Sequence, residues 1–273
     1  MKNFKLTIIC LFVCVFATAN VSKAERDALV SIYHATQGAE WNTSWDLQKP
    51  VSSWYGVTVK DNKVVGLNLQ MNNLQGELPQ EIGNLVSLQE LNLGFNKLEG
   101  NLPESLFNLR ALRTLKLFMN SFNGSIPEAV GQLTNLEVLE LFSNNLTGEI
   151  PSTIGSLKNL KKLILGSNFL TGSIPTQISE LVQLEELSLI DNKLEGQIPS
   201  EIGSLVNLKE LILTSNNLSG YLPYELANLK ELRTVMLGDN NLTNSDVASL
   251  IEQDPTDILT KFQFASESAI ATD

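Results

Sequence analysis

Cysteine and histidine are almost absent from the chain, which has two cysteines and one histidine among its 273 residues. Both cysteines, Cys10 and Cys14, lie inside a segment that has the pattern of a secretory signal peptide. Lys2 and Lys5 precede an apolar run over residues 6–19. Removal of this leader would leave a chain without thiols, which excludes disulfides, thiol catalysis and thiolate metal sites.

Two places could end the leader, because a signal peptidase requires small residues just before the bond that it cuts. The residues Ser-Lys-Ala at 22–24 predict cleavage before Glu25, so that residues 1–24 form the signal peptide. The residues Ala-Thr-Ala at 17–19 are the alternative. A helix of 14 residues spans about 21 Å against a hydrocarbon core of about 30 Å, which argues against a retained anchor. No later segment is apolar enough to span a membrane, and we expect a secreted protein, extracellular, periplasmic or at the cell surface.

Positive charge is also scarce. Acidic side chains outnumber Lys and Arg by 30 to 19, for a net charge of −11. Residues 1–24 contain three lysines and no acid, so the chain from Glu25 would carry −14. A surface of this sign repels phosphates, so nucleic acid is not an expected partner.

A repeat of 24 residues begins at Leu67 and continues without insertion or deletion through seven full copies to Thr234, with a partial eighth. Position 1 is Leu in seven copies, position 3 is Leu in all eight, and positions 10 and 13 are Gly and Pro in seven. Position 6 is always asparagine: Asn72, Asn96, Asn120, Asn144, Asn168, Asn192, Asn216 and Asn240. A period of this length indicates a solenoid of stacked coils.

Each recurring residue type has a physical interpretation. The Leu-x-Leu alternation predicts a short strand with its leucines inward. An asparagine amide both donates and accepts hydrogen bonds, so stacked asparagines can satisfy backbone groups of neighbouring coils. Glycine permits backbone conformations that other residues resist, and proline imposes an extended residue before it. One coil cannot bury its own leucines, but a stack of coils can.

The pattern LxLxxNxLxGxIPxxIGxLxxLxx resembles the plant-type subclass of leucine-rich repeat proteins, over residues 67–250. Plant receptor-kinase ectodomains and soluble polygalacturonase inhibitors share this pattern, as do many secreted bacterial proteins. The resemblance implies an α/β solenoid, a right-handed superhelix with a parallel concave β-sheet that is capped at both ends. It also implies a protein or peptide ligand.

The two raw ends of a parallel stack require caps. Residues 25–66 are expected to form the N-terminal cap, with apolar residues at helical spacing over 25–36 and a hairpin turning at Asp61 and Asn62. The segment 54–59 resembles the W-x-G-V-x-C motif of plant caps, but valine replaces the cysteine, as in bacterial members. This cap must therefore hold by packing alone. We expect a C-terminal cap and a mobile tail over residues 251–273.

Groups suited to catalysis are few. His34 lies in the expected cap helix, where a surface position is a simpler interpretation than a catalytic triad. The carboxylates fall mostly at variable repeat positions, which is typical of solvated charge. The sequence therefore predicts no enzymatic activity, no cofactor and no metal site. Five glycosylation sequons, at Asn42, Asn123, Asn145, Asn217 and Asn241, would be used only in a eukaryotic source.

Positions 2, 4 and 5 of each copy, with position 24 before them, should face outward from the concave sheet. Neighbouring strands lie about 4.8 Å apart, so large apolar residues in adjacent copies should form one exposed patch. The predicted ligand-binding residues are Met71, Phe95, Phe118, Met119 and Phe142, extended by Ile164 and Ile190. Position 23 alternates in sign from Arg113 through Glu137 to Lys161, which we interpret as a register device.

These observations favour a secreted, monomeric protein-binding module that recognises a protein or peptide through its concave face. An extracellular inhibitor of the polygalacturonase-inhibitor kind, or a carbohydrate-associated adhesin, is the alternative. A sugar site would need aromatic platforms flanked by Asp, Asn and Gln, and the Phe/Met patch has few such neighbours.

Overall fold

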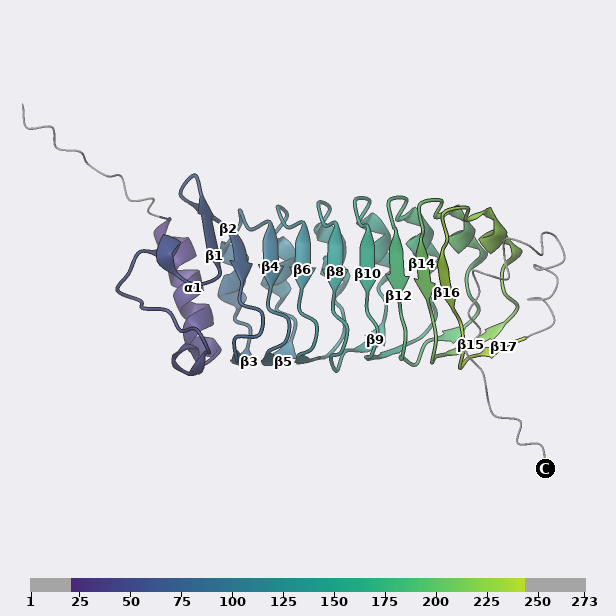
Figure 1. Cartoon of the computed structure of the whole chain (residues 1–273), viewed down its shortest axis with the longest axis horizontal. Helices are drawn as coiled ribbons and strands as arrows, with labels where there is room; N and C mark the ends of the chain where they lie inside the picture. The colour runs from purple at the N-terminus through teal and green to yellow at the C-terminus, as the bar shows by residue number, and fades with distance from the viewer. Residues whose placement is uncertain (1–20, 244–273) are drawn as a thin grey trace, which may run out of the picture.

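The protein is an elongated stack of coils with a helix at its N-terminal end, and the computed structural model describes residues 21–243 (Figure 1). Helix α1 spans Lys23–Ala35 and covers the first coil. Each following coil contains one strand of a long sheet, a loop, and a short 3-10 helix that returns to the next strand. The C-terminal cap expected over 251–273 lies outside the described residues.

The long sheet has nine strands in the order β1-β2-β4-β6-β8-β10-β12-β14-β16. Only β1 and β2 pair antiparallel, as the cap hairpin, and the strands from β2 onward are parallel. Equivalent leucines are in register across the sheet, for example Leu91 with Leu115. The strands are β1 Val57–Lys60, β2 Lys63–Asn68, β4 Glu90–Asn92, β6 Thr114–Lys116, β8 Val138–Glu140, β10 Lys162–Ile164, β12 Glu186–Ser188, β14 Glu210–Ile212 and β16 Thr234–Met236. The predicted parallel solenoid is confirmed.

Shorter strands follow the turn of each coil and pair in three small parallel sheets, along the lower edge in Figure 1. They are β3 Gln75–Glu77, β5 Lys97–Asn101, β7 Ser121–Asn123, β9 Thr147–Glu149, β11 Phe169–Thr171, β13 Glu195–Gly196, β15 Asn217–Gly220 and β17 Asn241–Leu242. The position-10 glycine of each full copy has a positive φ, 71° at Gly124, which explains the glycine.

The back of each coil is a 3-10 helix whose N-cap is the position-13 proline. Proline suits this place because its φ is fixed and it has no N–H to satisfy. The helices are η3 Gln80–Asn84, η4 Glu104–Asn108, η5 Glu128–Gln132, η6 Ser152–Ser156, η7 Thr176–Glu180, η8 Ser200–Ser204 and η9 Tyr224–Asn228. Two more, η1 Gly38–Glu40 and η2 Val51–Ser53, belong to the cap.

One hydrophobic core runs from the cap to the last described coil. It includes Ala28 of α1, the leucines of positions 1 and 3, and the apolar residues of positions 16, 19 and 22, up to Leu237. Most of these side chains have no exposed surface. The structure thus confirms the single leucine core that the repeat predicts, and the cap is part of it.

The position-6 asparagines form the expected ladder between coils. Asn144 donates from Nδ2 to the carbonyls of Leu141, at 2.9 Å, and Leu117 in the preceding coil, at 3.1 Å. Its Oδ1 accepts the backbone N–H of Phe122 at 3.0 Å. The same pattern recurs at Asn96, Asn120, Asn168, Asn192, Asn216 and Asn240. At the first coil, Asn72 instead bonds Thr43 of the cap.

Tryptophans hold the N-terminal cap together in the absence of a disulfide. Trp41, Trp45 and Trp54 are buried, and the ring of Trp45 contacts those of Trp41 and Trp54, with centroids 4.9 Å and 4.8 Å apart. Each indole N–H donates to a backbone carbonyl, so burial leaves no donor unsatisfied. The hairpin turns at Asp61 and Asn62, both with positive φ, as the sequence predicts.

We predict different costs for removing two neighbouring amides. Asn144→Ala should lower the free energy of unfolding by about 1–3 kcal/mol, because it leaves buried backbone groups of two coils without partners. Asn145 is exposed and its Nδ2 reaches only Ser121 O at 3.5 Å, so Asn145→Ala should cost little. Chemical denaturation of both variants measures the difference, and equal costs would contradict the ladder.

Candidate functional site

Three phenylalanines from consecutive coils form a stack on the concave sheet. The rings of Phe118 and Phe142 lie parallel with centroids 4.7 Å apart, and the ring of Phe95 meets Phe118 edge-on at 5.3 Å. The strand residues before them alternate as predicted, with Leu115 and Leu117 buried in the core and Lys116 between them partly exposed. The sequence therefore brings these rings together on the outer face of the sheet.

Phe118 is not exposed, and the expectation that it would be is wrong. Only 7% of Phe118 is accessible, although it lies outside the leucine core. Its ring occupies the space above Gly94 of the preceding coil, where an added Cβ would come within 2.6 Å of Phe118 Cζ. Phe142, which is half-buried, covers it from the other side. Phe118 therefore has a packing role, and its removal must affect stability.

A position-4 glycine followed by a bulky position-4 residue in the next copy is the sequence signal for this packing. The same arrangement recurs where Ile190 covers Gly166, since a Cβ there would lie 2.5 Å from Ile190 Cγ2. Ile190 and Ile164 are half-buried. They belong to later coils and do not line the groove described next.

The most exposed members of the predicted site share an unusual backbone conformation. Met71, Phe95 and Met119 occupy position 5 with φ of 56°, 55° and 51°, and they are 64%, 42% and 42% exposed. Bulky residues rarely adopt this left-handed conformation, which costs on the order of 1–2 kcal/mol per residue. Later copies place Ser or Asp at the same position with the same φ: Ser143, Ser167, Asp191, Ser215 and Asp239. The turn thus requires positive φ in every copy, and only the first three copies fill it with large apolar side chains.

These three side chains line a shallow groove of about 450 Å³ where the first coils meet the cap. Its other lining residues are Asn42, Asn73, Asn96 and Lys97. Asn42 belongs to the cap and donates to the carbonyl of Met71 at 2.8 Å. The sequence gives no signal for Asn42, Asn73 or Lys97, because the contact of the cap with the first coil is not encoded in the 24-residue period. We call the apolar residues Met71, Phe95, Phe118, Met119 and Phe142 the concave patch.

Ion pairs flank the concave patch and join adjacent strands. Lys116 pairs with Glu140 at 3.2 Å, and Lys162 with Glu186 at 2.5 Å. At position 23, Glu137 receives hydrogen bonds from Lys161 Nζ at 2.8 Å and Arg113 Nη1 at 2.7 Å. These hydrogen bonds hold the pKa of Glu137 below its usual value. The alternation of charge at position 23 therefore does link strands.

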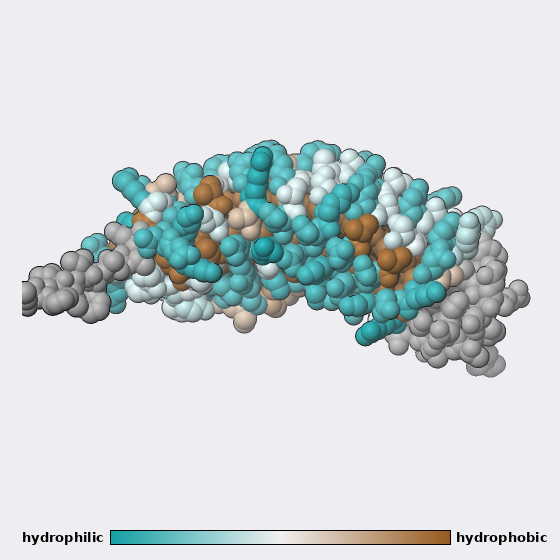
Figure 2. Space-filling view, turned by 90° about the horizontal axis from the view of Figure 1, so that it is seen from above, coloured by the Kyte–Doolittle hydropathy of each residue, from teal (hydrophilic) through white to brown (hydrophobic). Residues whose placement is uncertain are grey.

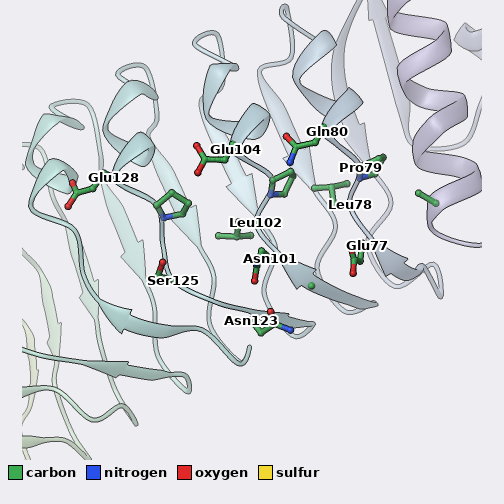
Figure 3. Close-up of a pocket in the computed structure, with 14 residues that line it drawn as sticks. Glu77, Leu78, Pro79, Gln80, Asn101, Leu102, Glu104, Asn123, Ser125 and Glu128 are labelled. Carbon is green, nitrogen blue, oxygen red and sulfur yellow. The ribbon is translucent and has the colours of Figure 1, made fainter.

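A second hollow lies away from the concave patch, behind the small strands of copies one to three (Figure 3). It has a volume of about 1130 Å³, and its lining combines prolines and leucines with carboxylate and amide side chains, among them Glu77, Gln80, Asn101 and Glu104. Within residues 21–243, no three His, Cys, Asp or Glu side chains are placed to hold a metal ion. His34 is exposed on α1, where its ring meets Tyr33 edge-on.

The edge at which the long strands begin is mainly hydrophilic, with isolated apolar patches (Figure 2). Exposed Val86, Val182 and Val206 lie in the turns before these strands, all at the same repeat position. No helix within residues 21–243 is long and apolar enough to cross a membrane. The concave patch differs from these valines in its contacting aromatic rings.

The chain is similar to proteins that are built from leucine-rich repeats. A family model described as "Leucine-rich repeat region" matches residues 111–269, and a "Leucine Rich Repeat" model matches 63–85 and 87–109. The PEPR1–AtPEP1 crystal structure is 36% identical, with a TM-score of 0.76 over 81% of this chain and 32% of that one. The ectodomain of the Arabidopsis receptor kinase HAESA, in complex with an IDA peptide hormone ligand, is 32% identical, with a TM-score of 0.73 over 82% and 39%.

A plant ice-binding protein is a further structural relative, with 27% identity and a TM-score of 0.65. The match covers 82% of this chain and 89% of that protein. By contrast, the chain spans only about a third of the two receptor chains. In receptor ectodomains, the leucine-rich repeat solenoid is typically a non-catalytic binding module.

We predict that two members of the concave patch, Phe118 and Phe95, contribute differently to stability. Phe118→Ala should lower the free energy of unfolding by about 3 kcal/mol, the low end of the range for a buried phenylalanine, because it empties a site between Gly94 and Phe142. Phe95→Ala should cost less than about 1 kcal/mol, because Phe95 is exposed and strained. Urea denaturation measures both, and a larger loss for Phe95 would overturn this division.

The ion pairs of Glu137 with Arg113 and Lys161 should contribute little to the free energy of unfolding, and only in a defined pH range. Because the folded-state pKa of Glu137 is lowered, its contribution is present above the unfolded-state pKa and is lost as the pH falls through the folded-state value. Glu137→Gln should therefore reduce stability by less than about 1 kcal/mol at neutral pH, and less in high salt, since the pair is solvent-exposed. Thermal denaturation at pH 7 and at pH 3, at two salt concentrations, tests this, and an effect that persists at pH 3 would refute it.

Proposed function

Because the chain belongs to the leucine-rich repeat family, we propose that it is a secreted protein-binding module that takes a protein or peptide ligand on the concave face of copies one to four. Its structural relatives include extracellular domains that bind a peptide hormone, which supports both parts of the proposal. The predicted net charge and the thiol-free solenoid suit an extracellular setting.

One observation carries this proposal: Met71, Phe95 and Met119 are both exposed and held in left-handed backbone. Serine or aspartate occupies the same turn with similar φ in the later copies, so the turn does not require a large apolar side chain. Exposed methionine and aromatic side chains also increase the risk of aggregation. A ligand that covers them explains why the first three copies carry them, since aromatic residues and methionine are enriched at protein interfaces.

The composition of the groove indicates the kind of ligand that fits. Its apolar wall suits one or two large apolar side chains of the ligand. At its rim, Asn42 and Asn73 each use one amide N–H on a backbone carbonyl, of Met71 and Glu40, and the second N–H of each suits a carbonyl of an extended segment. Lys97 suits a carboxylate. A groove of this size holds a short peptide segment better than a folded domain, so we favour a peptide or an exposed loop.

The test begins with peptides selected from a random phage-displayed library on the full secreted chain. For the selected peptides, Phe95→Ala combined with Met119→Ala should weaken binding at least 30-fold, about 2 kcal/mol, the range of interface hot spots. Phe169→Ala is the matched control, because Phe169 is 45% exposed but lies at position 7, outside the groove. Unchanged binding in the double variant, or equal loss in the control, would place the ligand elsewhere.

A carbohydrate-associated adhesin is the second candidate, and one surface feature favours it. Tyr221 and Tyr224 are 59% and 74% exposed, and with Gln197, Ser200 and Glu201 they line a hollow of about 570 Å³. Two exposed tyrosines beside an amide and carboxylates are the composition expected of a sugar site, and this hollow lacks the methionines of the concave patch. A glycan array screened with the full chain and with Tyr221→Ala plus Tyr224→Ala separates the two functions, because only an adhesin would lose glycan binding in that variant. Inhibition of a pectin-degrading enzyme remains a special case of protein binding.

A further inference from the structure

The residues just before the expected mature N-terminus are part of the folded cap. Val21 is 7% exposed and belongs to the continuous hydrophobic core. Ser22 is the N-cap of α1, and the helix itself begins at Lys23. Cleavage before Glu25 would therefore remove a core residue, the N-cap and the first two residues of the helix.

Ser22 and Glu25 form a reciprocal capping box. Ser22 Oγ accepts the backbone N–H of Glu25 at 3.2 Å. Glu25 Oε2 in turn accepts the backbone N–H of Ser22 at 3.2 Å and its hydroxyl at 2.7 Å. This motif satisfies two of the donors that a helix leaves unpaired at its start.

The same carboxylate connects the helix to the first strand of the solenoid. Glu25 is 5% exposed, and its Oε1 accepts the backbone N–H of Val64 in β2 at 2.9 Å. A nearly buried carboxylate is stable only while its oxygens are hydrogen-bonded. Loss of Ser22 would leave Oε2 without both of its donors and would place a new ammonium group beside the core.

We infer that the leader is cut at the alternative position, by hydrolysis of the Ala19–Asn20 peptide bond, so that residues 20–24 stay in the mature protein. Water supplies the hydroxyl for the new carboxylate of Ala19, and Asn20 becomes the free amine. Ala-Thr-Ala at 17–19 meets the small-residue requirement as well as Ser-Lys-Ala at 22–24 does. The mature chain then keeps Lys23 and carries a net charge of −13 instead of −14. This inference rests on the proposed secretion.

The primary experiment is intact-mass measurement and N-terminal sequencing of the full chain after export from a secreting host. A mature chain that begins at Asn20 is the expected result. A chain that begins at Glu25 overturns the inference, although secretion would then stand. A chain that stays inside the cell with Met1 or its following residue at the N-terminus overturns the secretion on which the inference depends.

Two matched variants locate the cut independently of sequencing. Ala19→Glu places a large charged residue before the inferred bond and should leave most of the precursor unprocessed. Ala24→Glu changes the other candidate in the same way, and processing should continue at the wild-type rate. Ala24 is exposed in the first turn of α1, where an acidic residue is tolerated by the helix dipole. The opposite pattern would assign cleavage to residues 22–24.

A stability measurement tests the physical reason for the choice. Chains produced without a leader and starting at Asn20 or at Glu25 should differ in thermal midpoint, with the shorter chain unfolding at least about 2–4 °C lower. Ser22→Ala in the longer chain should reproduce part of this decrease. Equal midpoints for the two chains would show that residues 20–24 do not contribute to the cap, and would remove the basis of the inference.

Discussion

The hydrogen bonds of the position-6 asparagines are the interactions on which the rest of the structure depends. Each coil turns sharply after its strand, and the turn leaves backbone carbonyls and N–H groups that water cannot reach. One side-chain amide satisfies groups of its own coil and of the coil before it, as Asn144 does for Leu141, Leu117 and Phe122. Within residues 21–243, no buried side-chain nitrogen or oxygen is left without a partner. The leucine core can therefore be continuous, because these hydrogen bonds hold adjacent coils in register and at a constant spacing.

This fixed stacking explains how the surface can vary without loss of the fold. The turn after each strand imposes positive φ at position 5 whatever the side chain, so Met71, Phe95 and Met119 adopt the conformation that Ser and Asp adopt later. The asparagine hydrogen bonds and the leucine core stabilise the stack enough to hold these residues in a strained backbone conformation. Large apolar groups at this position are therefore displayed from a backbone that the stack holds in one conformation.

The N-terminal cap solves the problem of the raw sheet end without a disulfide. Its tryptophans bury a large apolar area and direct each indole N–H to a backbone carbonyl. Asn72, the first member of the ladder, bonds Thr43 of the cap, and Glu25 bonds Val64 of β2. These contacts place Asn42 beside Met71, so the cap that closes the stack also completes the groove of the concave patch.

The 24-residue period by itself determined the strands, the single core, the asparagine ladder and the columns that share the concave face. Periodicity can do this because stacking in register returns every equivalent position to the same side. It could not determine that Phe118 is buried, because that depends on the empty space above Gly94 in the neighbouring coil. The left-handed turn at position 5 and the rim residue Asn42 were also decided by tertiary structure, since the first follows from backbone geometry and the second from a contact across 29 residues. Tertiary structure also decided the place of residues 21–24. Their sequence is typical of a leader, but in the fold they belong to the cap, because Ser22 bonds Glu25 and Glu25 bonds Val64 of β2.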